Sequence, residues 1–578
     1  MLDRAFLQAT LISAVCLLLL ANGYPQQKGK AFPSAYPAEW GVIFQPTRAL
    51  TEPANQFSFQ TYLGFSPGTK TLAKGTVLLP GTMPLPCDII WDRDVAIRLR
   101  DGITIYVDVF RPAKAAAKLP ALIAWAPYGK SLPADPVAHF NKTVPASWVS
   151  GLTRFEGPDP AFWCGHGYAV INVDTRGAFK SQGDIHHWGS VDAADGYEIV
   201  EWAAQQNWCS GKVAMNGTSW LGIAQWYIAA LQPPHLAAIS PWGAHFYDVY
   251  RWDLCRGGIP DASFDEYITS GMTGAGNRAE APYKMIAKYP LMHPYWEDKI
   301  ADLKKIRIPV YSVGAYGRDL QGFLDVASKE KWLRIENKGE WNDQYDPVNQ
   351  NDLLLFFDRY LKGIQNGWEK TPTVRLTIMN PGGSDEVNLP ETRWPPARTE
   401  YRKFYLDARS GKLDLKPVPN ASSAKYDAET GQAVFTVTCS EDTRIIGYPK
   451  LRLWVEAGGA NDMDLFVTVQ KAGSKGRVSW PDGRLRVSLR ELDPVLSTDF
   501  QPVHKFRKNQ YLSSGQIVPV DIAILPTGLL WRAGEQLLLT VAGNKLKGTA
   551  LAINKGAHII HTGSKYESYL QLPIVAPR

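Results

Sequence analysis

The strongest constraint on this chain is the sequence Gly-Thr-Ser-Trp-Leu-Gly at residues 217–222. The apolar run at 213–215 before it is typical of a buried strand, and the apolar run at 223–231 after it is typical of a helix. A serine at a tight strand-to-helix turn has a strained backbone and needs small neighbours, and the helix N-terminus behind it favours negative charge. We therefore predict that Ser219 is a nucleophile on an elbow, in preference to a simple helix N-cap.

Length and composition limit the class of protein. A chain of 578 residues is too long for one ordinary core, so we expect two or three domains. A hydrophobic content of 45% and an aromatic content of 11% indicate a globular protein. The net charge of +6 is spread along the chain without a basic tract, which argues against a nucleic-acid partner.

The N-terminus has the pattern of a secretory signal. Arg4 precedes an apolar run at 5–21, and the small residues at 21–23 suit a cleavage site. We predict that residues 1–23 are removed and that the mature protein is secreted or enters the lumen of the secretory pathway, without stable membrane association; a retained anchor is the alternative. Glycosylation sequons begin at Asn141 and Asn420. A third sequon, at Asn216, lies on the elbow, so we expect it to be buried and unmodified.

Cysteine spacing gives no sign of a metal or a cofactor. Cys16 lies in the predicted signal, which leaves an odd number of widely spaced cysteines: Cys87, Cys164, Cys209, Cys255 and Cys439. This arrangement matches no metal motif and allows one or two disulfides at most. We expect no cofactor and no metal.

The pattern along the chain predicts an arm and two domains. Residues 24–88 are rich in proline, glycine and aromatics and read as an extended arm. From 89 to 372, strands alternate with helices, which favours a doubly wound, mostly parallel α/β sheet. An insertion at about 244–300 is expected to form a cap over the strand ends. Residues 373–578 contain short strands with turn signals between them, as in an all-β sandwich.

An elbow serine needs an oxyanion hole, a base and an orienting acid. The backbone N–H of Trp220, the residue after the nucleophile, is one expected oxyanion donor. Tyr128, at the end of an earlier strand in the sequence Ala-Pro-Tyr-Gly-Lys (126–130), is a second candidate. The alternative for Tyr128 is a buried core tyrosine.

Several sequence blocks, in order, resemble the cocaine-esterase and X-prolyl dipeptidyl-peptidase family of serine hydrolases. They lie at residues 100–112, 126–130, 167–177, 181–184, 201–202, 208–212 and 217–222. The resemblance runs from about residue 90 to the C-terminus. It implies an α/β-hydrolase core, a helical cap and a C-terminal jelly-roll of the galactose-binding type. It also implies Ser219 as nucleophile, with Tyr128 and the Trp220 amide as the oxyanion hole.

The rest of the triad departs from the family pattern. The family acid aligns with Gly317, so Asp319, two residues later, is the candidate acid and Asp325 a weaker one. Glu340 stands where the family has its histidine, and the sequence Glu-Trp-Asn-Asp at 340–343 resembles a fungal-type subgroup. Glu340 can act as the base if burial raises its pKa.

Other histidines remain as alternative bases, each more often structural than catalytic: His186, His187, His245, His558 and His561. Of these, His245 follows the strand after the elbow and can plausibly reach the site.

The leading expectation is a serine esterase or amidase of a small molecule, acting through an acyl-enzyme on Ser219. Acyl transfer in natural-product metabolism is a close variant. The alternatives are a pseudoenzyme that binds an apolar or glycan ligand, and a lectin-like module. Glu280 and Asp265 are candidates for an acidic clamp on a substrate amine, as a dipeptidyl-peptidase needs, or are plain surface carboxylates.

Overall fold

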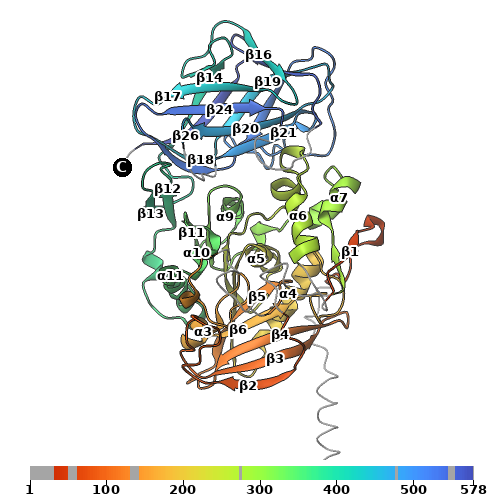
Figure 1. Cartoon of the computed structure of the whole chain (residues 1–578), viewed down its shortest axis with the longest axis vertical. Helices are drawn as coiled ribbons and strands as arrows, with labels where there is room; N and C mark the ends of the chain where they lie inside the picture. Colours follow the sequence, from red (N-terminus) through yellow and green to blue (C-terminus); the bar gives the residue numbers. More distant parts are fainter. Residues whose placement is uncertain are drawn as a thin grey trace, which may run out of the picture.

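The computed structural model describes residues 32–49, 62–130, 142–272, 276–474, 480–544 and 553–576. The predicted signal at 1–23 and the sequon at Asn141 lie outside these residues. Two large β-assemblies stand at opposite ends of the molecule, with the helices around the first (Figure 1). None of the helices in the described ranges is long and apolar enough to cross a membrane.

The first assembly is an 11-stranded sheet with the order β13-β12-β11-β10-β8-β7-β5-β6-β4-β3-β2. Its strands are β2 (Gly68–Leu72), β3 (Ile89–Arg98), β4 (Thr104–Pro112), β5 (Leu119–Ala126), β6 (Ala169–Asp174), β7 (Cys209–Thr218), β8 (Leu236–Trp242), β10 (Val310–Gly314), β11 (Lys331–Ile335), β12 (Val374–Ile378) and β13 (Glu386–Glu391). The run from β6 through β5 and β7 to β12 is parallel, and the outer strands on both sides are antiparallel.

Strand β5 shows why the central strands are apolar throughout. Ile123 and Trp125 belong to one buried cluster, whereas Leu122 belongs to another. Successive side chains of a strand point to opposite faces, so both faces of the sheet are covered. The α/β-hydrolase architecture predicted from alternating strands and helices is confirmed.

Helices connect the parallel strands: α3 (Pro160–Gly165), α4 (Gly189–Ala204), α5 (Trp220–Ala230), α9 (Gln321–Asp325), α10 (Glu340–Tyr345) and α11 (Pro347–Phe357). Helices α4 and α5 pack closely because Gly196 has no side chain. A β-carbon at Gly196 would collide with the side chain of Ile228. The contact fixes α5, and with it the elbow that α5 follows.

The insertion between β8 and β10 is mainly helical. It contains η4 (Tyr250–Leu254), η5 (Arg256–Gly258), α6 (Ser263–Tyr267), η6 (Ile268–Met272), β9 (Arg278–Glu280), α7 (Pro282–Lys288) and α8 (Pro294–Asp298). Strand β1 (Phe44–Pro46), from the N-terminal arm, pairs antiparallel with β9. In Figure 1 this insertion lies beside the hydrolase body and reaches toward the second β-assembly.

The second assembly has 13 strands around one apolar core. They are β14 (Thr399–Asp407), β15 (Lys412–Asp414), β16 (Ser422–Asp427), β17 (Gln432–Thr438), β18 (Thr443–Gly447), β19 (Lys450–Gly458), β20 (Asp464–Lys471), β21 (Asp482–Arg486), β22 (Val518–Ala523), β23 (Thr527–Trp531), β24 (Gln536–Ala542), β25 (Ala557–Thr562) and β26 (Tyr569–Val575). This confirms the all-β C-terminal domain. We call it the sandwich.

The first sheet continues past the predicted domain boundary at 372/373. Residues 374–378 were expected to open the sandwich, but β12 pairs in parallel with β11, where Leu333 lies opposite Val374. Strand β13 then closes this edge of the first sheet. The passage to the sandwich therefore falls between β13 and β14, not at 372/373. A short apolar strand carries no mark of the sheet that it joins, so the sequence cannot make this distinction.

The cysteines in the described part of the chain are all free thiols: Cys87, Cys164, Cys209, Cys255 and Cys439. The disulfide that the sequence allowed is not formed in this structure.

Candidate active site

Ser219 occupies a strained elbow. Its backbone has φ 55° and ψ −121°, and its side chain makes no cap hydrogen bond to the helix that follows. A β-carbon at Gly217 would lie 2.5 Å from that of Leu221, and one at Gly222 would lie 2.5 Å from the carbonyl oxygen of Trp242. Both glycines are therefore required by close packing, and the N-cap alternative for Ser219 is not supported.

Neighbouring backbone holds the elbow in place. The Ser219 N–H donates to the carbonyl of Trp242 at 3.0 Å, and the Thr218 N–H donates to the carbonyl of Glu156 at 3.0 Å. Trp220 begins α5, where first-turn N–H groups have no acceptor within the helix. The amide predicted to serve the oxyanion hole thus lies at a helix N-terminus that favours negative charge.

Tyr128 lies directly beside the elbow. It follows β5, is 1% exposed, and its ring meets the ring of Trp220 edge-on at 5.8 Å. Burial raises the pKa of Tyr128 well above its usual value, and the carboxyl groups of Glu156 and Glu340 raise it further. The phenol is therefore protonated at neutral pH and is available as a hydrogen-bond donor.

A histidine and an aspartate meet on the loops next to the elbow. Nδ1 of His245 lies 2.5 Å from Oδ1 of Asp319. Asp319 is fixed from behind, because its Oδ2 accepts from the Ala315 N–H at 2.9 Å. The loop that carries His245 packs on the elbow helix, since a β-carbon at Gly222 would lie 3.2 Å from that of Ala244. The structure thus pairs the predicted acid with one of the five alternative histidines.

The charges around His245 stabilise its protonated form. Burial alone would lower its pKa, but the carboxylates of Asp319 and Glu340 together outweigh this effect. The guanidinium of Arg318 opposes it weakly. The net pKa of His245 is raised above its usual value. With Nδ1 held by Asp319, Nε2 is the nitrogen left for proton transfer.

Glu340 lies on the other side of the same imidazole. Its Oε2 is 3.7 Å from Nε2 of His245. A β-carbon at Gly243 would lie 2.7 Å from this oxygen and 3.2 Å from Cγ2 of Thr218, so the carboxyl group reaches the backbone beside Ser219. Burial raises the pKa of Glu340; His245 lowers it and Asp319 raises it again.

Glu156 stands behind Glu340 and was not found from the sequence. It is 3% exposed, and its Oε1 accepts from the indole N–H of Trp341 at 2.9 Å. Burial raises the pKa of Glu156 well above its usual value, and the charge of Glu340 raises it further. The two neighbouring carboxyl groups thus disfavour each other's charged form. Glu156 lies in a loop without a motif, so no sequence signal marks it.

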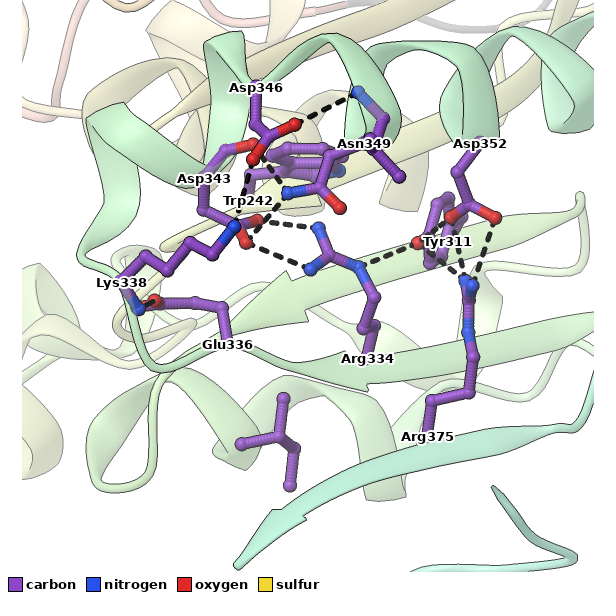
Figure 2. Close-up of polar contacts among 12 residues, drawn as sticks. Trp242, Tyr311, Arg334, Glu336, Lys338, Asp343, Asp346, Asn349, Asp352 and Arg375 are labelled. Carbon is purple, nitrogen blue, oxygen red and sulfur yellow. Dashed lines mark hydrogen bonds and ion pairs between the residues drawn. The ribbon is translucent and has the colours of Figure 1, made fainter. Parts of the chain in front are cut away.

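A buried network fixes the segment that carries Glu340 (Figure 2). Arg334, on β11, donates to both carboxylate oxygens of Asp343, on α10, at 2.9 and 2.5 Å. Its Nε donates to the hydroxyl of Tyr311 at 3.0 Å, and its guanidinium lies 5.3 Å from the ring centre of Trp242. Since Trp242 also accepts from the Ser219 N–H, the network links the Glu340 helix to the elbow.

The turn before α10 is closed by Glu336. Its Oε2 accepts from the N–H groups of Lys338 and Gly339 at 2.6 and 2.7 Å, and burial raises its pKa to about 7. Lys338 in turn donates to Asp346 at 2.9 Å (Figure 2). The loop between β11 and α10 is therefore held at both ends.

The other candidate histidines have structural partners. Nε2 of His187 lies 2.9 Å from Asp265, and burial lowers the pKa of His186 to about 4. His558 and His561 lie on β25, in the sandwich, and contact Asn554 and Glu456 respectively.

Two further acidic candidates also have partners outside the candidate active site. Glu280 forms an ion pair with Lys299 at 2.7 Å, and both side chains are fully buried. It is therefore not free to bind a substrate amine. Asp325 accepts from the Tyr247 hydroxyl at 2.8 Å.

Comparisons with known proteins agree with this architecture. Residues 101–281 match the family model of the X-Pro dipeptidyl-peptidase (S15 family), and residues 366–571 match that of the X-Pro dipeptidyl-peptidase C-terminal non-catalytic domain. The solved structure of a CocE/NonD family hydrolase from Staphylococcus aureus is similar, with a TM-score of 0.81 and 32% identity, covering 88% of this chain and 97% of that one.

A curated relative extends the match. The cocaine esterase of Rhodococcus sp. is 24% identical over 603 residues, covering 83% of this chain and 98% of that protein. An α-amino acid ester hydrolase, with a TM-score of 0.62 and 16% identity over 85% of this chain and 97% of that one, shares the fold. The resemblance predicted from the sequence blocks is confirmed, and this chain belongs to the cocaine-esterase and X-Pro dipeptidyl-peptidase family of serine hydrolases.

Proposed function

We propose that this protein is a serine esterase or amidase that cleaves a small-molecule substrate through an acyl-enzyme on Ser219. The observation that carries the proposal is the contact between Nδ1 of His245 and Asp319 on loops beside the elbow. It supplies a base and an orienting acid in a chain that lacks the histidine at the family position. This is the main argument against the pseudoenzyme alternative.

Each residue then has a chemical role. Nε2 of His245 takes the proton as Ser219 Oγ attacks the carbonyl carbon of the substrate, and Asp319 holds the imidazole in the required tautomer. The Trp220 amide and the Tyr128 hydroxyl donate to the oxygen that becomes negative. His245 gives its proton to the leaving group, and an incoming water repeats the sequence to release the acid.

Glu340 has a supporting role in this proposal. Its carboxylate faces Nε2 of His245 and stabilises the imidazolium that forms during each transfer. Because Glu340 stands where relatives have their histidine, we infer that the base moved to the end of β8 and that the old position kept a charged group. A base role for Glu340 itself is the competing assignment.

A fluorophosphonate probe tests the proposal. We expect labelling of the wild type, and none of Ser219→Ala. His245→Gln should slow labelling strongly, whereas Glu340→Gln should retain much of it. Absence of labelling in the folded wild type would favour the pseudoenzyme. Loss of labelling in Glu340→Gln together with full labelling of His245→Gln would make Glu340 the base.

The proposal has two further parts, namely where the protein is sent and which molecule accepts the acyl group. We propose that residues 1–23 are a cleaved signal, which N-terminal sequencing of the secreted protein tests. Acyl transfer to an alcohol or amine in place of water is a close variant of this proposal. Product analysis with added acceptors separates transfer from hydrolysis.

A further inference from the structure

A cavity of about 40 Å³ lies where the cap, the hydrolase body and the sandwich meet. Its lining residues come from all three parts. They include Arg251 and Arg256 from the cap, Gln321 from the start of α9, and Arg484 and His504 from the sandwich. Ser219, Tyr128, His245 and Glu340 are not among them. The cavity is therefore distinct from the candidate active site.

The charged side chains that line this cavity are all cationic. Arg251 and Arg256 come from the cap, and Arg484 faces them from β21. Each has an aspartate partner: Arg251–Asp248 at 2.7 Å, Arg256–Asp482 at 3.0 Å and Arg484–Asp261 at 3.2 Å. None of these aspartates lines the cavity. Two of the pairs cross the interface, because Asp482 lies on β21 and Asp261 lies in the cap. The cavity lining itself therefore contains guanidinium groups and no carboxylate.

Two buried nitrogen atoms in this lining are unsatisfied. Nε of Arg484 and Nε2 of His504 have no hydrogen-bond partner among the described residues. The two residues are only 8% and 5% exposed, so bulk water does not compensate. A buried polar atom without a partner costs free energy, and its presence points to a ligand or an ordered water.

Neighbouring guanidinium groups act on Arg256 although it has an aspartate partner. Burial lowers its pKa to about 10. Asp482 opposes this change, but the neighbouring guanidinium groups of Arg484 and Arg318 lower the pKa further. A bound anion would relieve this repulsion between like charges.

The size and walls of the cavity limit the ligand. A volume of about 40 Å³ restricts the cavity to a small ligand. Phe500, Phe506 and Ile524 form apolar walls, which weaken screening and strengthen each charge-assisted hydrogen bond.

We propose that this cavity binds a small oxyanion, of the size and charge of acetate or bicarbonate, that bridges the cap to the sandwich. The anionic oxygens accept from Arg256 and from Nε of Arg484. A hydroxyl of the ligand, or a water that enters with it, reaches Nε2 of His504. The ligand thus adds to the two ion pairs, Arg256–Asp482 and Arg484–Asp261, that already join the cap to the sandwich.

Thermal unfolding of the full chain tests the proposal. Sodium acetate, sodium bicarbonate and sodium chloride are titrated at constant ionic strength, balanced with the bulky anion of the HEPES buffer. We expect a saturable rise in Tm with acetate or bicarbonate. No saturable rise with either salt would overturn the proposal, and an equal rise with chloride would overturn the oxyanion assignment.

Variants locate the effect. Arg256→Gln should lose the saturable rise, whereas Arg111→Gln should keep it, because Arg111 makes an ion pair with Asp92 at 3.1 Å outside the cavity. An unchanged response in Arg256→Gln would contradict the site. A crystal structure of the wild type grown in sodium acetate does not depend on the stability of any variant. Density for acetate between Arg256 and Arg484 is expected, and water alone at full acetate concentration would refute the proposal.

Discussion

Nδ1 of His245 and Oδ1 of Asp319 lie 2.5 Å apart although the two residues are separated by 74 positions in the sequence. His245 follows β8 and Asp319 follows β10, and these strands are neighbours in the sheet. Parallel strands place their carboxyl ends at one edge, so the two loops meet next to the elbow after β7. In the function proposed above, this contact supplies the base and the orienting acid.

The first prediction concerns the nucleophile. Ser219→Ala should reduce kcat with an activated ester by about 10⁴ to 10⁶, because it removes the hydroxyl proposed to form the acyl-enzyme. The small side chain also fits the elbow, so circular dichroism should be unchanged. Turnover that survives in a folded Ser219→Ala enzyme would show that the acyl-enzyme forms elsewhere.

The second prediction separates the two possible bases. His245→Gln should lower kcat/KM by about 10³ or more, since it removes the group that accepts the serine proton. Glu340→Gln should cost far less, because the base remains. Steady-state kinetics of both variants decide the matter, and the reverse order of effects would assign the base to Glu340.

The third prediction tests the oxyanion donor. Tyr128→Phe should lower kcat by about 10² with little change in KM, as expected when one hydrogen bond to the transition state is lost. The phenyl ring preserves the edge-on contact with Trp220, so packing is maintained. An unchanged kcat would reduce Tyr128 to a core residue.

The fourth prediction follows from the raised pKa of His245. The base must be neutral to act, so kcat/KM should rise with pH through a pKa above the ordinary value of about 6.5. Glu340→Gln removes a negative charge that stabilises the imidazolium, and the rising limb should therefore move to lower pH. A limb that stays in place would mean that Glu340 does not act on His245.

The fifth prediction concerns the network in Figure 2. Asp343→Asn removes one partner of a buried ion pair with Arg334 and should destabilise the hydrolase domain by about 3–5 kcal/mol. The matched control is Asp442→Asn, which breaks an exposed pair with Arg532 and should change the stability far less, because solvent screens the pair. Urea unfolding followed by tryptophan fluorescence measures the free energy of unfolding of both variants. An equal loss in the two would show that the network does not stabilise the domain.

The sequence predicted what depends on local pattern. The elbow at Ser219 could be recognised because its glycines, strand and helix are contiguous. Asp319 could be proposed because it follows a recognisable strand. His245 was one of five alternatives, since its partnership depends on strand order in the sheet, which one sequence does not state. Glu156 was missed entirely, because only burial beside Glu340 gives it significance.

The sequence did not reveal which sheet β12 joins, for a related reason. Strand β12 has the apolar alternation of a sandwich strand, yet it hydrogen-bonds to β11. Local propensity decides that a strand forms, and long-range pairing decides which sheet receives it.

The pairing of β1 with β9 makes the cap a unit of two separate pieces of chain. Tyr36, also from the N-terminal arm, donates to Glu280 at 3.1 Å and accepts from Lys299 at 3.0 Å. An exchange of caps between family members, aimed at altering specificity, must therefore transplant this arm together with the insertion. Moving the insertion alone would leave the edge of β9 unpaired. It would also leave the buried Glu280–Lys299 ion pair without its hydrogen bonds to Tyr36.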